Sequence, residues 1–394
     1  MTAQIGNASD DLTGWSWRFP VADLGIVPFL AVLPFMFVPK ILDGDTQPWV
    51  LIAALFALFT YRPREFFDRR DLPIVALAAL SLAALGLRTG ASPEFLRAGY
   101  IFLTFTVLWI LARRDRGDWF GLGVRITIGV WFAVGVYQYL ATLLGIPVEI
   151  TGRFVEGRGG VPSLAAEPSY YGSINIIMMM YLLHCRRSGD AIYLIMASIG
   201  VLISGSVLSL ILLIFPLLLL RPGVLLMTLA GVTLLFMGDA AVNEAGVTAR
   251  LASLGNPGQG VVALLIDPSL NLRFGHIAFT LYENFWRGLV MVGPINFQDE
   301  YNIFAANTGF LILTESNFIL TSGGDLVYGS GIFGAIICII LIYTASSGKI
   351  NFNVKLTRST FVFACLLNPV SIANPFLVFF CLQGVSKFWD SRKQ

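Results

Sequence analysis

The chain has 394 residues, of which 56% are hydrophobic and 13% are charged. So few charges cannot cover the water-exposed surface of a globule of this length, which excludes an ordinary soluble protein. The formal net charge of +2 is nearly neutral and provides no general field for polyanions, so we expect no nucleic-acid partner.

Apolar segments recur along the whole chain, and several approach the roughly 20 residues that a helix needs to cross about 30 Å of hydrocarbon. We predict them at residues 21–39, 48–61, 73–88, 96–112, 119–145, 170–184, 191–205, 206–220, 223–238, 325–344 and 359–384. The predicted fold class is therefore all-α, a polytopic transmembrane helical bundle of about 11–12 spans. No internal repeat or linker is visible, so residues 1–394 are expected to form a single integral membrane domain whose first span is retained.

Positive charges indicate the orientation, because Lys and Arg concentrate in short cytoplasmic connections. The expected cytoplasmic residues are Arg62, Arg64, Arg69, Arg70, Arg113, Arg114, Arg116, Arg186, Arg187, Arg221, Lys349, Lys355, Arg358, Lys387, Arg392 and Lys393. They alternate consistently if residues 191–220 form two spans and residues 359–384 form a tight pair broken at Pro369 and Pro375. Both termini are then predicted to be cytoplasmic.

This alternation leaves two substantial segments on the opposite side of the membrane, residues 145–168 and the large loop 239–325. The large loop contains three apolar stretches, which are expected to be short amphipathic or re-entrant helices lying against the membrane. They are residues 261–266, 279–292 and 310–320. These two outer segments are where chemistry is expected.

The most unusual window is residues 151–172, TGRFVEGRGGVPSLAAEPSYYG, which is rich in glycine and charge and leads directly into a span. Arg153 and Arg158 present planar forks of donors that suit a phosphate, and the neighbouring glycines allow close approach of the backbone. Glu167 precedes Pro168 at the expected first turn of a helix, so it is predicted to occupy an N-cap-like position at the membrane surface. For each residue taken alone, the ordinary alternative is structural: the arginines contact lipid headgroups, and Glu167 only caps the helix.

Three features resemble the Wzy-type polysaccharide polymerases, within the O-antigen ligase and polymerase superfamily. They are the stretch from Arg158 to Tyr171 with its Glu-Pro-Ser motif, the serine-bearing span LISGSVLSL at 202–210, and the Arg and His residues of the late loop. The resemblance implies an enzyme of the bacterial inner membrane whose active site faces the periplasm. It would join undecaprenyl-diphosphate-linked glycans into a surface polysaccharide, in contact with membrane lipids, and its candidate protein partners are a chain-length regulator and a flippase.

The implied reaction defines what the site must contain. Departure of a lipid diphosphate requires positive charge, which arginine supplies without a metal or cofactor, so none is expected. The candidates on the outer side are Arg153, Arg158, Arg250 and Arg273. Attack by a sugar hydroxyl requires a general base, for which Glu167 and His276 are both candidates. Ser169 and Tyr170, beside Glu167, are the expected sugar contacts.

Small and aromatic residues have more ordinary explanations. Ser204, Ser206 and Ser209 are expected to permit close helix packing, although they also suit a chain turn or an isoprenoid groove. Most rings near the outer interface are expected to be membrane anchors, with one or two available to stack on sugars. These rings are Tyr170, Tyr171, Tyr282, Phe285, Trp286 and Tyr301.

Alternative functions remain open at this stage. An O-antigen ligase-type transfer to another acceptor fits the same layout, and the segment 271–276 only loosely matches the ligase histidine pattern. A transporter of lipid-linked sugars is less favoured, because no repeat is evident and charges avoid the centres of the predicted spans, with Arg97 and Arg125 as the main exceptions. Asp43 and Asp45 define a metal-dependent glycosyltransferase as the weakest alternative. The GxGxxG match at 329–334 opens a predicted span and is interpreted as a helix-packing face.

Overall fold

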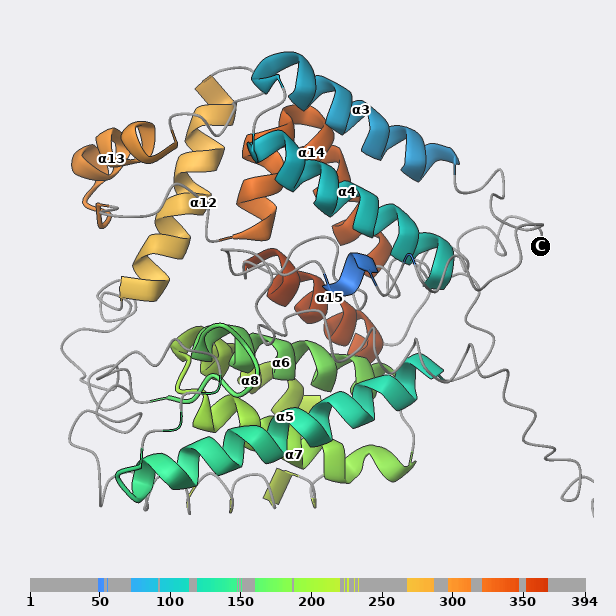
Figure 1. The fold of residues 1–394 in the computed structure, drawn as a ribbon, viewed down its shortest axis with the longest axis vertical. Helices are drawn as coiled ribbons and strands as arrows, with labels where there is room; N and C mark the ends of the chain where they lie inside the picture. Colours follow the sequence, from blue (N-terminus) through green and yellow to red (C-terminus); the bar gives the residue numbers. More distant parts are fainter. Residues whose placement is uncertain are drawn as a thin grey trace, which may run out of the picture.

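The computed structural model describes part of the chain in detail. The described residues are 49–52, 55, 72–90, 93–112, 119–146, 148, 150, 160–185, 188–219, 223, 225, 226, 230, 233, 268–286, 297–312, 321–346 and 352–367. All regular structure within them is helical, which confirms the all-α class. Figure 1 shows a lower group of helices, α5 to α8, and an upper group, α3, α4, α12, α13 and α14, with α15 between the two groups.

The helices follow the apolar segments of the sequence in the first half of the chain. Their bounds are α3 Leu72–Thr89, α4 Pro93–Ala112, α5 Trp119–Leu143, α6 Pro168–Cys185, η2 Ser188–Asp190, α7 Ala191–Ile203, α8 Val207–Leu219, α12 Pro268–Trp286, α13 Phe297–Thr308, α14 Ser322–Ser346 and α15 Phe352–Leu367. The predicted segments from 73–88 to 206–220 are thus confirmed as helices, including the division of 191–220 into two. Segments 21–39 and 261–266 lie outside the described residues.

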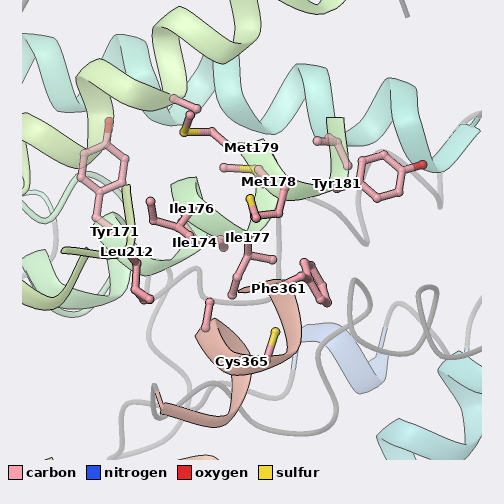
Figure 2. Packing of buried hydrophobic residues seen from close by; sticks show 14 of the residues in the cluster. Tyr171, Ile174, Ile176, Ile177, Met178, Met179, Tyr181, Leu212, Phe361 and Cys365 are labelled. Carbon is pink, nitrogen blue, oxygen red and sulfur yellow. The ribbon is translucent and has the colours of Figure 1, made fainter. Parts of the chain in front are cut away.

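Helix α6 is the centre of the lower group. Every residue from 171 to 182 is buried, so the helix is enclosed on all sides rather than amphipathic. It packs against α5, α7, α8 and α15. Figure 2 shows Phe361 and Cys365 of α15 on the side of α6 that carries Ile177. This enclosure fixes the position of the residues at the start of α6.

Helix α14 is not the single straight span predicted at residues 325–344. It is broken at Gly331, whose φ of 53° and ψ of −128° lie outside the helical region. A Cβ added at Gly334 would collide with the carbonyl of Leu326, so the chain folds back closely on itself there. Glycine tolerates this positive φ because it has no Cβ. The glycines at 329–334 therefore form a bend, and their interpretation as a helix-packing face was incomplete.

Helix α15 contradicts the boundary predicted at residue 359. It begins at Phe352, so Lys355 and Arg358 lie within a helix and not in a connecting loop. Arg358 is only 2% exposed. The rule that cations mark loops failed here because this arginine is packed into the protein. Residues 368–384, where the second half of the predicted pair would lie, are outside the described residues.

Two described helices, α12 and α13, lie within residues 239–325. Helix α12 begins at Pro268, 11 residues before the predicted start at 279, and α13 covers Phe297–Thr308, where no apolar stretch was predicted. Of the predicted stretch 310–320, residues 310–312 are not helical and residues 313–320 lie outside the described residues. The reason is visible in the composition, since α12 and α13 include polar residues such as Asn271, Arg273 and Asp299 that interrupt their apolar character. Hydropathy therefore marked only the C-terminal part of α12 and no part of α13.

Among the described residues, one helix is long and apolar enough to cross a membrane, by its length and composition alone. The segment Gly121–Leu143 of α5 has 23 residues and is apolar enough to cross a bilayer. Shorter apolar helices are Gly99–Ile110, Ala191–Ile203, Val207–Leu218 and Gly331–Tyr343. The 13 residues of α7 extend about 20 Å, which is less than the hydrocarbon thickness of about 30 Å.

Candidate functional site

Glu167 lies at the N-terminus of α6, as predicted. Its carbonyl accepts hydrogen bonds from the amides of Tyr170 and Tyr171 at 3.1 and 3.2 Å, and Pro168 is the first residue of the helix. Proline suits this position because its missing N–H would have no partner within the helix. Glutamate is not one of the residues that usually cap helices, since Ser, Thr, Asp and Asn have the appropriate length. The Glu167 side chain is half-buried.

The two expected sugar contacts lie beside Glu167. The hydroxyl of Ser169 is 3.4 Å from Oε2 of Glu167, and both residues are half-buried. Tyr170 is also half-buried and packs against the apolar core with one part of its side chain. The first turn of α6 thus carries a carboxylate, a hydroxyl and an aromatic ring. Together these groups can accept a proton from a sugar, hydrogen-bond to a sugar and stack on one.

The chain before Glu167 is a buried turn and not a solvated loop. Residues 161 to 166 are all buried, and the amide of Val161 donates to the carbonyl of Ile203 at 3.0 Å. The hydroxyl of Ser163 donates to the carbonyl of Trp131 in α5 at 2.7 Å. A Cβ added at Gly160 would collide with the carbonyl of Ser204. These contacts tie the turn to both α5 and the end of α7.

The serine-bearing segment forms the break between α7 and α8. Gly205 has a φ of +61°, and Ser206 caps α8 by accepting a hydrogen bond from the amide of Ser209 at 3.4 Å. The hydroxyl of Ser204 donates to the carbonyl of Val201 at 2.6 Å. Gly172 faces this break so closely that a Cβ there would lie 2.5 Å from the Ser204 hydroxyl. The serines therefore turn the chain and permit close packing, two of the three roles considered for them.

Arg273 and His276 lie one turn apart on α12, so they share one face of the helix. Arg273 is 6% exposed and His276 is fully buried. The His276 ring makes edge contacts with the rings of Tyr301 and Phe297, with centroid distances of 4.7 and 5.1 Å. Phe279 and Tyr328 belong to the same aromatic cluster. A sugar hydroxyl cannot reach this imidazole without a rearrangement of the cluster.

The surroundings of His276 also determine its protonation. Burial and then the positive charge of Arg273 lower the pKa of His276 to about 3. Burial likewise raises the pKa of Tyr301 to about 12. His276 is therefore neutral at pH 7, and a proton placed on it would be poorly stabilised. A group with so low a pKa is a weak general base.

The structure brings only part of the predicted site together. Glu167, Ser169 and Tyr170 are neighbours at the start of α6. Arg273 and His276 form a second group, on a helix that packs on α14 in the upper part of Figure 1. The other predicted arginines, Arg153, Arg158 and Arg250, lie outside the described residues, as do Asp43 and Asp45.

Two of the predicted interface anchors are core residues instead. Tyr171 and Tyr301 are both fully buried, whereas Tyr282 is 48% exposed. The partners that hold Tyr171 and Ser163 on α5 were not predicted, because a bond to a backbone carbonyl of a distant helix leaves no pattern in the sequence. Only the position of Tyr171, directly after Glu-Pro-Ser-Tyr, connected it with the site.

Comparison of the chain with models of protein families, with curated proteins and with solved structures finds no match. The resemblance to polysaccharide polymerases therefore rests on the motifs of the sequence itself.

Proposed function

We propose that the protein is a membrane glycosyltransferase that polymerises undecaprenyl-diphosphate-linked oligosaccharides on the periplasmic side of the bacterial inner membrane. The observation that carries the proposal is the half-buried carboxylate of Glu167 at the first turn of α6, beside Ser169 and on a turn that is fastened to two neighbouring helices. A fixed carboxylate with access to the surface is what a general base for a sugar hydroxyl requires.

The proposed reaction forms one glycosidic bond and breaks one bond to phosphate. A hydroxyl oxygen of the acceptor glycan attacks the anomeric carbon of the donor glycan, and its proton passes to the Glu167 carboxylate. The bond between the anomeric carbon and the diphosphate oxygen breaks, and undecaprenyl diphosphate leaves with the electron pair. Arg153 and Arg158, from the segment just before the described turn, are proposed to stabilise the charge that develops on the leaving group.

A membrane location is supported by the surface of the described helices as well as by composition. On α5, large apolar side chains are exposed along one face at Leu122, Ile126, Val130, Tyr137 and Leu140, each with at least 38% of its surface accessible. A stripe of this kind on a chain with 13% charged residues suits contact with lipid. The opposite face of α5 contains the fully buried Val124, Ile128 and Trp131, which pack in the core.

The proposal is tested by incubating the purified protein in detergent with one defined undecaprenyl-diphosphate oligosaccharide in the presence of EDTA. A ladder of products at multiples of the repeat unit is expected. Loss of the ladder on chelation would instead favour a metal-dependent enzyme, for which Asp43 and Asp45 are the candidate metal ligands. An inert substrate with every acceptor would favour a carrier of lipid-linked sugars.

A ligase of the same superfamily is the second candidate, because Arg273 and His276 share one face of α12, but that reaction would require the buried His276 to become accessible. The same assay separates the two functions. A ligase leaves the single substrate intact and consumes it only when a different lipid acceptor is added.

A further inference from the structure

The turn that carries Glu167 is fastened on both sides to a single backbone carbonyl. The hydroxyl of Ser163 donates to the carbonyl oxygen of Trp131 at 2.7 Å, and the hydroxyl of Tyr171 donates to the same oxygen at 3.2 Å. Ser163 lies four residues before Glu167 and Tyr171 lies four residues after it. One atom of α5 therefore fixes the chain at both ends of the segment on which the carboxylate lies.

Ser163 is held in a backbone conformation that serine rarely adopts. Its φ of 54° is the one positive value at a non-glycine position among the described residues. A left-handed conformation costs an L-residue roughly 1–2 kcal/mol, so surrounding contacts must maintain it. The side chain is fully buried, and its bond to Trp131 supplies such a contact.

The hydroxyl of Tyr171 lies in a slot formed by two glycines of neighbouring helices. A Cβ added at Gly135 of α5 would lie 2.5 Å from this oxygen, and one added at Gly200 of α7 would lie 2.9 Å from it. The tyrosine ring also stacks on the ring of Trp131, with centroids 6.1 Å apart. Both helices are thus shaped to accept this hydroxyl, which locates the start of α6 against α5.

We propose that Ser163 and Tyr171 are positioning residues for the Glu167 carboxylate, with the carbonyl of Trp131 as their shared anchor. This inference rests on the proposed function, in which Glu167 accepts the proton of the attacking hydroxyl. A displacement of about 1 Å at a catalytic group can reduce the rate about 100-fold. Two fixed points that flank Glu167 symmetrically restrict such displacement without touching the substrate.

The test combines hydrogen–deuterium exchange of the purified protein with kinetics on the lipid-linked oligosaccharide. The variants are Ser163→Ala and Tyr171→Phe, which remove one hydroxyl each. Their matched controls are Ser198→Ala, whose hydroxyl bonds to the carbonyl of Leu194 in its own helix and contacts Sδ of Met179 at 3.6 Å, and Tyr181→Phe, another buried tyrosine of α6. The two positioning variants should exchange the amides of residues 164–171 at least about tenfold faster, while α12 is unchanged.

The kinetic expectation is specific to a positioning role. Both variants should lower kcat by about 10- to 100-fold with KM within about threefold of wild type, and both controls should retain wild-type kcat. The double variant should lose less than the product of the two single losses, because both hydroxyls hold the same carbonyl.

The possible failures are distinguishable. If wild type produces a ladder but the variants match it in kcat and in exchange, the positioning inference is wrong and the polymerase remains. If wild type produces no ladder while exchange at 164–171 rises in the variants only, the shared anchor remains and the proposed function is wrong. A general rise in exchange across α5 to α8 would show that the hydroxyls support the whole bundle, which would overturn a role specific to Glu167.

Discussion

The start of α6 and the aromatic cluster around His276 on α12 (the α12 cluster) both bury polar side chains, but the surroundings of these side chains differ. At α6 the buried hydroxyls of Ser163 and Tyr171 donate to a carbonyl of a neighbouring helix, and Glu167 stays half-exposed. At α12 the imidazole of His276 is enclosed by aromatic rings. The difference bears on the general base of the proposed reaction. A general base must be held firmly and yet be reached by substrate, and Glu167 is half-buried whereas His276 is fully buried.

The largest expected effect is on activity. Glu167→Gln removes the proton acceptor while keeping the size of the side chain, so kcat should fall by at least about 100-fold. His276→Gln should retain kcat within about fivefold, because the imidazole is buried and neutral. Rates of ladder formation by purified variants measure both. A reversed order, with His276→Gln inactive and Glu167→Gln active, would assign the base to the late loop.

The arginines before the turn should show a similar effect. Arg158→Ala is expected to abolish chain extension while the protein remains folded in membranes. Arg158→Lys should also be poor, with a loss of at least about tenfold, because an ammonium does not reproduce the two-pronged contact of a guanidinium with a diphosphate. Product lengths on gels provide the measurement. Wild-type lengths from Arg158→Ala would remove this residue from the site.

A large effect on stability is expected where the turn meets the α7–α8 break. Gly160→Ala places a Cβ against the backbone carbonyl of Ser204, which cannot move independently, so a loss of about 2–4 kcal/mol is expected. Gly129→Ala in α5 is the matched control, since a Cβ there meets nothing within 4 Å. It should be neutral or slightly stabilising because alanine favours the helix. Unfolding midpoints in detergent measure both, and equal midpoints would contradict the close approach.

The stability of the protein should depend on pH through His276, in the aromatic cluster on α12. The folded pKa of His276, about 3, lies below its usual value near 6.5, so the unfolded chain binds a proton more readily. Its contribution to stability is fully present above pH 6.5 and is lost as pH falls toward 3. Between pH 7 and 5 this amounts to about 2 kcal/mol. Unfolding midpoints of wild type should drop more steeply than those of His276→Gln, and parallel curves would contradict the burial of a neutral imidazole.

The smallest effects on stability should come from two buried tyrosines. Tyr171→Phe removes a hydroxyl that donates to Trp131 and should cost about 1 kcal/mol of stability. The hydroxyl of Tyr301 makes no hydrogen bond to the residues that the structure describes, so Tyr301→Phe should change stability by less than about 0.5 kcal/mol or increase it slightly. Calorimetric unfolding midpoints compare the two variants. A larger loss of stability in Tyr301→Phe than in Tyr171→Phe would contradict this expectation.

Helices α3 to α8 were predictable because hydropathy is a local property and each of these helices is a continuous apolar run. The position of Glu167 at a helix start was also predictable, from the proline that follows it. The break of α14 was not, since Gly331 lies in a run that is apolar on both sides. Arg358 shows the opposite error, because a buried cation resembles a loop cation in sequence.

The contacts around Glu167 could not be predicted from the sequence. Ser163 looks like any serine of a polar turn, and neither its positive φ nor its partner 32 residues earlier in the chain has a local signature. The distance between Glu167 and His276 in the fold also has no local signature in the sequence. Both depend on how helices pack, and packing is set by many weak contacts together.

The most direct test of the central claim is the stoichiometry of the reaction. Two preparations of the same undecaprenyl-diphosphate oligosaccharide, one with labelled sugar and one with labelled lipid, are mixed with the purified protein. We predict that one undecaprenyl diphosphate is released for each new glycosidic bond, and that Glu167→Gln stops release and chain growth together. Release of lipid diphosphate without longer glycans, or longer glycans at an unchanged rate from Glu167→Gln, would contradict this prediction.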